Sequence, residues 1–275
     1  MEETKEQQAP SMAPVEPGEI EMGHADKLVG VFTEPGNTFS KMVKAGAKTT
    51  DWIIPILIVI LVAILSNIVM MSNPIIKHSI VEKQMQQMEK TFDDMIAKGQ
   101  LTEAQKEEQM NNVRDRMEQG GMAMNTIFTS IGITIFTFLT FFVVSGVFML
   151  FSKFALKGEG TYKDAMSAYG LPYYIVIIQV IIMMILALVM NKFFTGTSVA
   201  EFAGMEKSDL AGFLLSKLDP FSIWFYSVIS IGFAKMFKSE NTVKYFIMIF
   251  GLWIGFGLIL FFIAKAVPFL SFLAQ

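Results

Sequence analysis

The stretch 52-WIIPILIVILVAILSNIVMMS-72 contains no acidic or basic side chain. A helix of about 20 apolar residues is long enough to cross the ~30 Å hydrocarbon core of a bilayer, where charged side chains are costly. A long polar segment precedes the stretch, whereas a cleaved signal peptide has only a short basic leader. Residues 52–72 are therefore predicted to form a membrane-spanning helix that stays in the mature protein.

Four more apolar stretches meet or approach this length, and none of them contains Asp or Glu. They cover residues 126–152, 171–190, 220–237 and 245–269. Their lysines, Lys235 and Lys265, lie near an end of a stretch, from which a long side chain can reach the membrane surface. The predicted fold class is therefore all-α, a bundle of five transmembrane helices.

The composition excludes several classes of function. Of 275 residues, 53% are hydrophobic and 17% are charged, and the chain has no Cys and only two His, His24 and His78. These counts exclude disulfides, a thiolate or histidine-rich metal site and a thiol nucleophile. A net charge of −3 gives no basic footprint for nucleic acid. We predict no catalytic residue, metal or cofactor.

Lysines predict the orientation in the membrane. They gather before the first apolar stretch, between the second and third, and between the fourth and fifth: Lys41, Lys44, Lys48, Lys153, Lys157, Lys163, Lys238 and Lys244, with Lys235 just inside the fourth stretch. The alternate connections carry more acids than bases. Because cytoplasmic segments are enriched in Lys and Arg, the N-terminus is predicted to be cytoplasmic and the C-terminus outside.

The N-terminal part divides into two pieces. Residues 1–25 are acidic and poor in aromatic side chains, which predicts a disordered tail ahead of a membrane domain at 26–275. In the next piece, apolar residues such as Val31 and Phe39 alternate with lysines. This pattern is typical of a short amphipathic helix on the cytoplasmic membrane surface. A loop packed on the bundle is the alternative.

The polar insert between the first two stretches predicts a helical hairpin at about 79–118, outside the membrane. Apolar residues spaced by four and three positions give its first helix one apolar side: Val81, Met85, Met88, Phe92 and Met95. Gly99 suits the end of that helix, and Thr102 with Gln105 forms a capping box for a second. The hairpin either binds a partner, or it closes on itself or rests on the bilayer.

Polar and small residues inside the apolar stretches are few. Asn67 and Gln179 are isolated, as expected for hydrogen bonds between helices rather than for catalysis. Gly251 and Gly255 form a small-xxx-small pair that suits either a close helix contact or a flexible, unwound element.

Two aspartates lie at the beginning of apolar stretches. Asp51, with Pro55 four residues later, and Asp219, followed directly by Pro220, both match the N-cap position of a helix. Trp224 suits the membrane interface. Since the predicted topology puts the two aspartates on opposite sides, we do not expect them to form a catalytic pair.

In this order, the segments resemble the Yip family of five-span, Rab-interacting-type membrane proteins, which has relatives in prokaryotes. The resemblance rests on VFTEPGNTFSKM (31–42), TTDWIIP (49–55), GEGTYKDAMSAYGLPYY (158–174) and LDPFSIWFYSVISIGFAKMF (218–237). TTDWIIP is similar to the family's Asp-Leu-x-Gly-Pro motif, with Ile54 at the glycine position. Tyr169 and Gly170 match the family's Tyr-Gly element at the start of the third span.

The resemblance implies a cytoplasmic N-terminus, an outside C-terminus and a helical bundle. For eukaryotic members it also implies traffic between endoplasmic reticulum and Golgi and binding of prenylated Rab-type GTPases. Here the insert of residues 73–125 replaces the short loop that is usual in those members. We therefore expect a prokaryotic member in the plasma membrane, with the endoplasmic reticulum or Golgi membrane as the alternative.

The sequence thus predicts a non-enzymatic integral membrane protein that organises lipid, other membrane proteins or further copies of itself. A transporter or channel for a small solute is the alternative.

Overall fold

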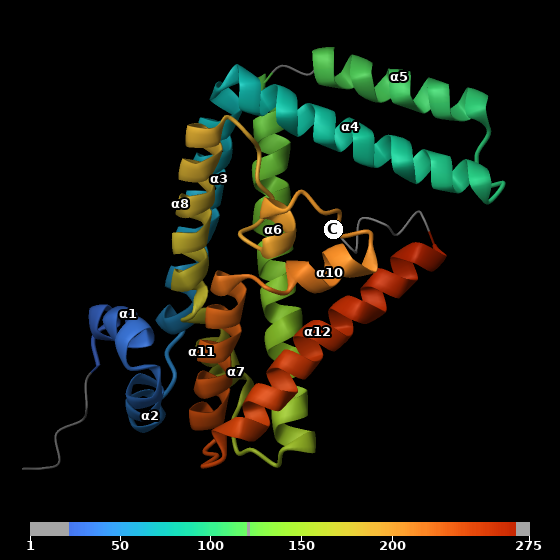
Figure 1. Cartoon of the computed structure of the whole chain (residues 1–275). Coiled ribbons are helices and arrows are strands. Elements are labelled where there is room, and N and C mark those ends of the chain that lie inside the picture. Colours follow the sequence, from blue (N-terminus) through green and yellow to red (C-terminus); the bar gives the residue numbers. More distant parts are fainter. Residues whose placement is uncertain (1–21, 120–121, 268–275) are drawn as a thin grey trace, which may run out of the picture.

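The structure, a computed structural model, describes residues 22–119 and 122–267, and in these residues it is helical without strands (Figure 1). Four helical segments are long and apolar enough to span a membrane. They are α3 (Thr50–Ser72), α6 (Met122–Leu150) extended by the π-helical turn η1 (Phe151–Ala155), α8 (Tyr173–Met190) together with α7 (Tyr162–Gly170), and α12 (Thr242–Ala266). The all-α prediction is confirmed for the described residues, and four of the five expected spans correspond to these segments.

The expected span at 220–237 is α11 (Pro220–Met236), which has 17 residues and is shorter than the other four. It packs against α2 (Pro35–Ala45), α7, α8 and α12, so that many of its side chains are buried. Among them, Ile229 and Phe233 have no exposed surface. α11 therefore forms the centre of the bundle rather than one of its lipid-facing walls.

Side-chain caps fix where several helices begin. Asn73 precedes α4 (Pro74–Ala97), and its Oδ1 accepts hydrogen bonds from the N–H groups of Ile75 and Ile76. Thr161 precedes α7 and forms a reciprocal capping box with Asp164. Such caps satisfy N–H groups that the first turn of a helix leaves without a partner.

The main core is aromatic and lies where α3, α6, α7, α8 and α11 meet. Phe141 of α6 stacks on Trp52 of α3 and on Tyr169 of α7, with ring centroids 5.2 and 5.5 Å apart. Tyr169 also meets the rings of Tyr173 and Phe225 edge to face. Edge-to-face and offset-stacked aromatic pairs add to the free energy gained by burial. This cluster joins the beginning of α3 to the middle of α6.

The N-terminal helices differ from the expected interfacial helix. α1 (His24–Thr33) and α2 form a pair, and α2 lies against α11 (Figure 1). Val31, Phe39 and Met42 have no exposed surface and belong to the main core. Their apolar side chains therefore contact the protein and not lipid. α1 begins inside the expected tail at 1–25, of which residues 1–21 lie outside the described residues.

The polar insert forms the two helices α4 and α5 (Glu103–Gln119), joined by a turn in which Gly99 has φ +68°. Lys106 of α5 pairs with Asp93 of α4. Thr102 and Gln105 form the expected capping box, with Thr102 N donating to Gln105 Oε1 over 3.0 Å and Gln105 N donating to Thr102 Oγ1 over 3.3 Å. The two helices lie at the end of the bundle opposite α2 (Figure 1).

The connection between α8 and α11 contains the short helices α9 (Val199–Phe202) and α10 (Leu210–Ser216) and is tied to α4. Lys83 of α4 pairs with Glu201 at 3.5 Å, and Lys90 pairs with Glu206. α4 also reaches the end of α12, since Lys98 Nζ donates to the carbonyl oxygen of Lys265 over 3.1 Å. The insert therefore rests on the connection and on the last turn of α12.

Candidate functional site

A buried ion pair joins α1 to the first turn of α3. Lys27 Nζ lies 2.5 Å from Asp51 Oδ1, and the two side chains are 2% and 0% exposed. Lys27 lies on the side of α1 that faces the bundle, as does Val31 four residues later. Because a lone buried charge is very costly, the pair holds α1 on the bundle as long as both charges are present.

The other carboxylate oxygen of Asp51 is also engaged. Asp51 Oδ2 accepts from Lys48 N over 2.8 Å and from Ser167 Oγ of α7 over 3.5 Å. This corrects the expectation that Asp51 is the N-cap, because the position before α3 is Thr49, which makes no side-chain cap bond. Asp51 lies inside the first turn, where it joins α1, α3 and α7.

A histidine lies beside this pair. His24 Nε2 and the hydroxyl group of Tyr174 on α8 are 2.6 Å apart, while His24 Nδ1 is buried and has no hydrogen-bond partner among the described residues. Burial lowers the pKa of His24, Asp51 opposes this shift, and Lys27 adds to it. The neutral imidazole is therefore favoured, with one ring nitrogen free to accept from or donate to a further group.

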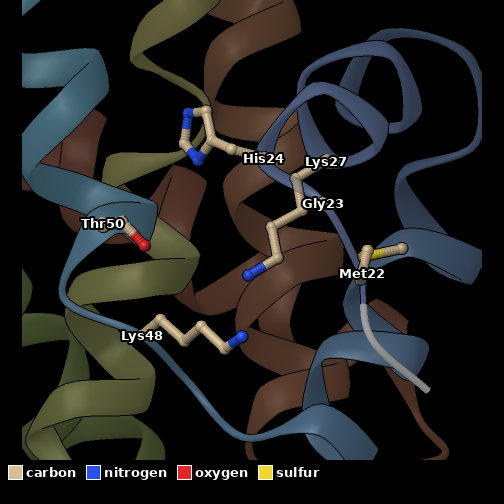
Figure 2. A pocket seen from close by; sticks show the side chains of 6 residues that line it. All are labelled: Met22, Gly23, His24, Lys27, Lys48 and Thr50. Carbon is tan, nitrogen blue, oxygen red and sulfur yellow. The ribbon is translucent and has the colours of Figure 1, made fainter. Parts of the chain in front are cut away.

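A cavity of about 330 Å³ opens next to these residues, lined by Met22, Gly23, His24, Lys27, Lys48 and Thr50. Figure 2 shows the side chains of Lys27 and Lys48 ending in the same space, with the Thr50 hydroxyl group on the other side of it. The lining comes from α1, from the loop before α3 and from the beginning of α3. The cavity is therefore rich in hydrogen-bond donors.

Three more of the residues singled out by the sequence lie near Asp51. Pro55 is buried in α3, one turn after Asp51. Gly170 lies against α3 so closely that an added Cβ would be 2.6 Å from Trp52 Cα. Tyr169, its neighbour, lies in the aromatic core. The structure thus brings together Asp51, Pro55, Tyr169 and Gly170 at the crossing of α3 with the α7–α8 junction.

Asp219 belongs to a second polar cluster. Its Oδ1 accepts from Phe221 N over 3.0 Å and from Thr197 Oγ1 over 2.8 Å, and its Oδ2 accepts from Gln179 Nε2 over 3.1 Å. Pro220 is the first residue of α11. Asp219 therefore occupies the N-cap position and also ties the preceding loop to α8.

The sequence did not predict how far along α8 this cluster lies. Gln179 lies in the first half of α8, about 16 Å of helix rise from its last residue, Met190. α11 therefore begins beside the body of α8 and not level with its end. Trp224, in the second turn of α11, lies 5.6 Å from the ring of Phe32 on α1 and so contacts the N-terminal helices.

The remaining expected contacts between helices are not made within the described residues. Asn67 is half-buried on α3, and no hydrogen bond links its side chain to another helix there. Cβ atoms added at Gly251 and Gly255 would meet no atom within 4 Å, so neither glycine permits a close contact inside the described chain. Gln179 does form hydrogen bonds, but to Thr197 in the preceding loop and to the N-cap residue Asp219 rather than to the body of another helix.

Sequence reasoning missed four residues of these clusters: His24, Lys27, Ser167 and Thr197. Lys27 lies among other lysines that are exposed, and Thr197 lies in a polar connection. Nothing in the local sequence distinguishes either from a surface residue. Val31, one turn after Lys27, is the one signal that this side of the helix is buried.

The chemistry available to the two clusters is binding and anchoring. Lys27, Asp51 and Asp219 are the charged residues that are buried as a whole in the part of the chain that the structure describes, and each is engaged with a neighbouring segment. The side chain of Glu201 is also little exposed and pairs with Lys83 of α4. Within those same residues no group of three potential ligands could hold a metal ion.

One of three comparisons with known proteins identifies a family. A family model, that of the Yip1 domain, matches residues 29–264. No curated protein and no solved structure matches the chain. The family match begins within α1 and ends within α12, and it includes Asp51, Tyr169, Gly170 and Asp219. Since it covers most of the chain, the protein belongs to the Yip family of membrane proteins.

Proposed function

We propose that this protein organises protein or lipid partners at a membrane and has no enzymatic activity of its own. The observation that carries the proposal is that three buried charged residues, Lys27, Asp51 and Asp219, are engaged in contacts that join segments of the chain. An enzyme needs reactive groups that converge on one point with a substrate between them. Here the surfaces left for contact are the two ends of the bundle.

The proposed topology has five spans, with α11 as the short fourth one. α11 rises about 26 Å, close to the thickness of the hydrocarbon core. The bond from Lys98 to the end of α12 supports a C-terminus on the side of α4 and α5. The beginning of α3 and the α11–α12 turn both lie in the lower half of the view, away from α4 and α5 (Figure 1).

The lysine-rich connections support a cytoplasmic location for the end of the bundle away from α4 and α5. Glu159, in the connection after η1, pairs with Lys238 after α11 at 3.7 Å, and its N–H donates to the carbonyl oxygen of Phe237 over 3.1 Å. Connections rich in lysine thus meet on one side, as the positive-inside rule requires of the cytoplasmic face. We place the protein in a prokaryotic plasma membrane, with α4 and α5 outside.

In this proposal the α4–α5 hairpin is the outer contact surface. α5 is mostly polar, and Glu107, Glu108 and Asn112 are exposed. Adjacent membrane proteins or a second copy of the chain are the partners that such a projecting hairpin can reach. A Rab-type GTPase would have to bind at the cytoplasmic end, where α1 and α2 are folded onto the bundle.

A cross-linking experiment tests this surface. Since the chain has no cysteine, single cysteines can be placed at Glu108 and, as a control, at the buried Ile80 of α4. With a membrane-impermeant thiol cross-linker on intact cells, Glu108→Cys should give one discrete adduct and Ile80→Cys none. Recovery of the Glu108→Cys chain only in its free form would contradict the proposal.

The Asp219 cluster favours a second candidate, a transporter for a small solute. It places a carboxylate against the body of α8, and acids within a membrane are typical of coupled transporters. A solute path would make a stripe of positions around Asn67 and Gln179 accessible to a polar thiol reagent. Single-cysteine scanning of α3 and α8 measures this access, and a stripe that does not react would exclude the transporter.

A further inference from the structure

The cavity beside α1 has more hydrogen-bond donors than the chain uses. The Lys27 ammonium group has three N–H donors, of which Asp51 Oδ1 accepts one. Lys48 Nζ and the Thr50 hydroxyl group make no hydrogen bond to another described residue, although both lie on the cavity. His24 Nδ1 is buried and unpaired as well. The donors of Lys27, Lys48 and Thr50 are therefore available to an acceptor that enters the cavity.

The charge of the lining is positive. Asp51 offsets Lys27, both oxygens of Asp51 are already engaged, and Lys48 forms no ion pair with another residue that the structure describes. Asp26, the nearest acid on α1, is exposed and accepts from Gly23 N over 3.1 Å. A ligand that uses all of these donors is an anion with several acceptor oxygens.

The cavity lies at the level where the apolar part of α3 begins. Thr50 lines the cavity, and the run of apolar side chains begins at Trp52, one residue after Asp51. Lipid headgroups occupy this level of a spanning helix, and anionic lipids are enriched at the cytoplasmic face. A volume of about 330 Å³ accommodates a phosphate group together with part of a headgroup.

We propose that the cavity formed by His24, Lys27, Lys48 and Thr50 binds a phosphate group, which Lys27 and Lys48 contact with their ammonium groups and Thr50 with its hydroxyl group. A lysine is a point charge suited to phosphate oxygens, and hydrogen bonds between charged groups are stronger than neutral ones. The phosphate can belong to an anionic lipid or be a free ion. The proposal is independent of what the hairpin contacts.

The test titrates the purified full chain in neutral detergent with dioctanoyl phosphatidylglycerol, followed by native mass spectrometry, and with inorganic phosphate, followed by calorimetry. Lys48→Gln removes a cavity charge without breaking a hydrogen bond within the described chain. Lys44→Gln is the matched control, because Lys44 is an exposed lysine of α2 outside the cavity lining. Lys27 is left intact because its loss would leave Asp51 buried without its counter-charge.

We expect Lys48→Gln to weaken binding about tenfold and Lys44→Gln to change it less than twofold. A tenfold loss seen with the lipid identifies a headgroup site, and a tenfold loss seen with inorganic phosphate alone identifies a site for the free ion. Absence of binding by the unchanged protein in both titrations would overturn the proposal. Equal weakening by the two variants would also overturn it, because the attraction would then be that of a general positive surface.

Discussion

Lys27 and Asp51 form a buried ion pair. The free energy of such a pair depends strongly on whether both partners are present. The pair connects helices that are distant in the sequence, and both partners are almost fully buried. Removal of one partner leaves the other as an uncompensated charge, which costs about 3–5 kcal/mol. Replacement of both by apolar side chains avoids that cost.

We therefore expect Lys27→Met to lower the free energy of unfolding by about 3–5 kcal/mol. The double variant Lys27→Met/Asp51→Leu should recover most of this loss, because it leaves no buried charge. Unfolding of the purified variants in detergent, followed by circular dichroism, measures both values. A double variant that is less stable than either single variant would show that the pair does not act as a unit.

His24 makes the docking of α1 sensitive to pH. Burial lowers its pKa below the ordinary value of 6.5, against the effect of Asp51 and together with that of Lys27. The folded state thus binds a proton less readily than the unfolded state. The contribution of neutral His24 to the free energy of unfolding is therefore fully present above pH 6.5 and is lost as the pH falls through the lowered pKa. We expect the unfolding temperature to fall between pH 7.5 and pH 5.5 in the unchanged protein and to fall less in His24→Gln. Equal falls in both proteins would contradict this role.

Substitutions of Asp219 distinguish its role as a helix cap from the role of its negative charge. Asn keeps one oxygen for the N–H groups of Phe221 and Ser222, but its amide group would face Gln179 Nε2, which is itself a donor. We expect Asp219→Asn to lower the unfolding free energy by about 1 kcal/mol and Asp219→Ala by about 2–3 kcal/mol, since Ala leaves several buried donors unpaired. Chemical unfolding ranks the two variants, and an Asn variant as unstable as Ala would show that the charge itself is needed.

At the scale of helices, the close contact of α7 with α3 depends on a missing side chain. A Cβ at Gly170 would overlap Trp52, whereas a Cβ at Gly251 on α12 would meet open space. Gly170→Ala should therefore cost at least about 1–3 kcal/mol through displaced helices, while Gly251→Ala should be neutral or slightly stabilising. Thermal unfolding of the two variants provides a matched comparison. Equal effects would mean that the helices do not approach each other as described.

Apolar length and capping patterns predicted most helices because both are local properties. The runs at 52–72 and 245–269 correspond to α3 and α12, and the Thr102–Gln105 box begins α5 as expected. The sequence did not reveal that α2 is folded onto α11. An amphipathic helix has the same pattern whether its apolar side meets lipid or protein, so its partner is decided by tertiary packing, which periodicity does not report.

At the scale of the whole molecule, polar contacts between segments distant in the sequence were the least predictable feature. The sequence marked Asp51 and Asp219 as helix-starting residues, but their partners Lys27, Ser167 and Thr197 lie 24, 116 and 22 positions away. These partners draw α1, α7 and the loop before α11 onto the bundle. The outcome is a membrane domain with a folded cytoplasmic end and a projecting outer hairpin, as we propose.

The position of these two ends on opposite sides of the membrane is the central claim, and single-cysteine labelling tests it directly. Intact cells carrying either Glu108→Cys on α5 or Lys157→Cys in the connection after η1 would be treated with a thiol reagent that does not cross membranes. Both native residues are exposed. We predict that Glu108→Cys reacts at once and that Lys157→Cys reacts only after the cells are permeabilised. Labelling of both positions from the same side would contradict the five-span topology.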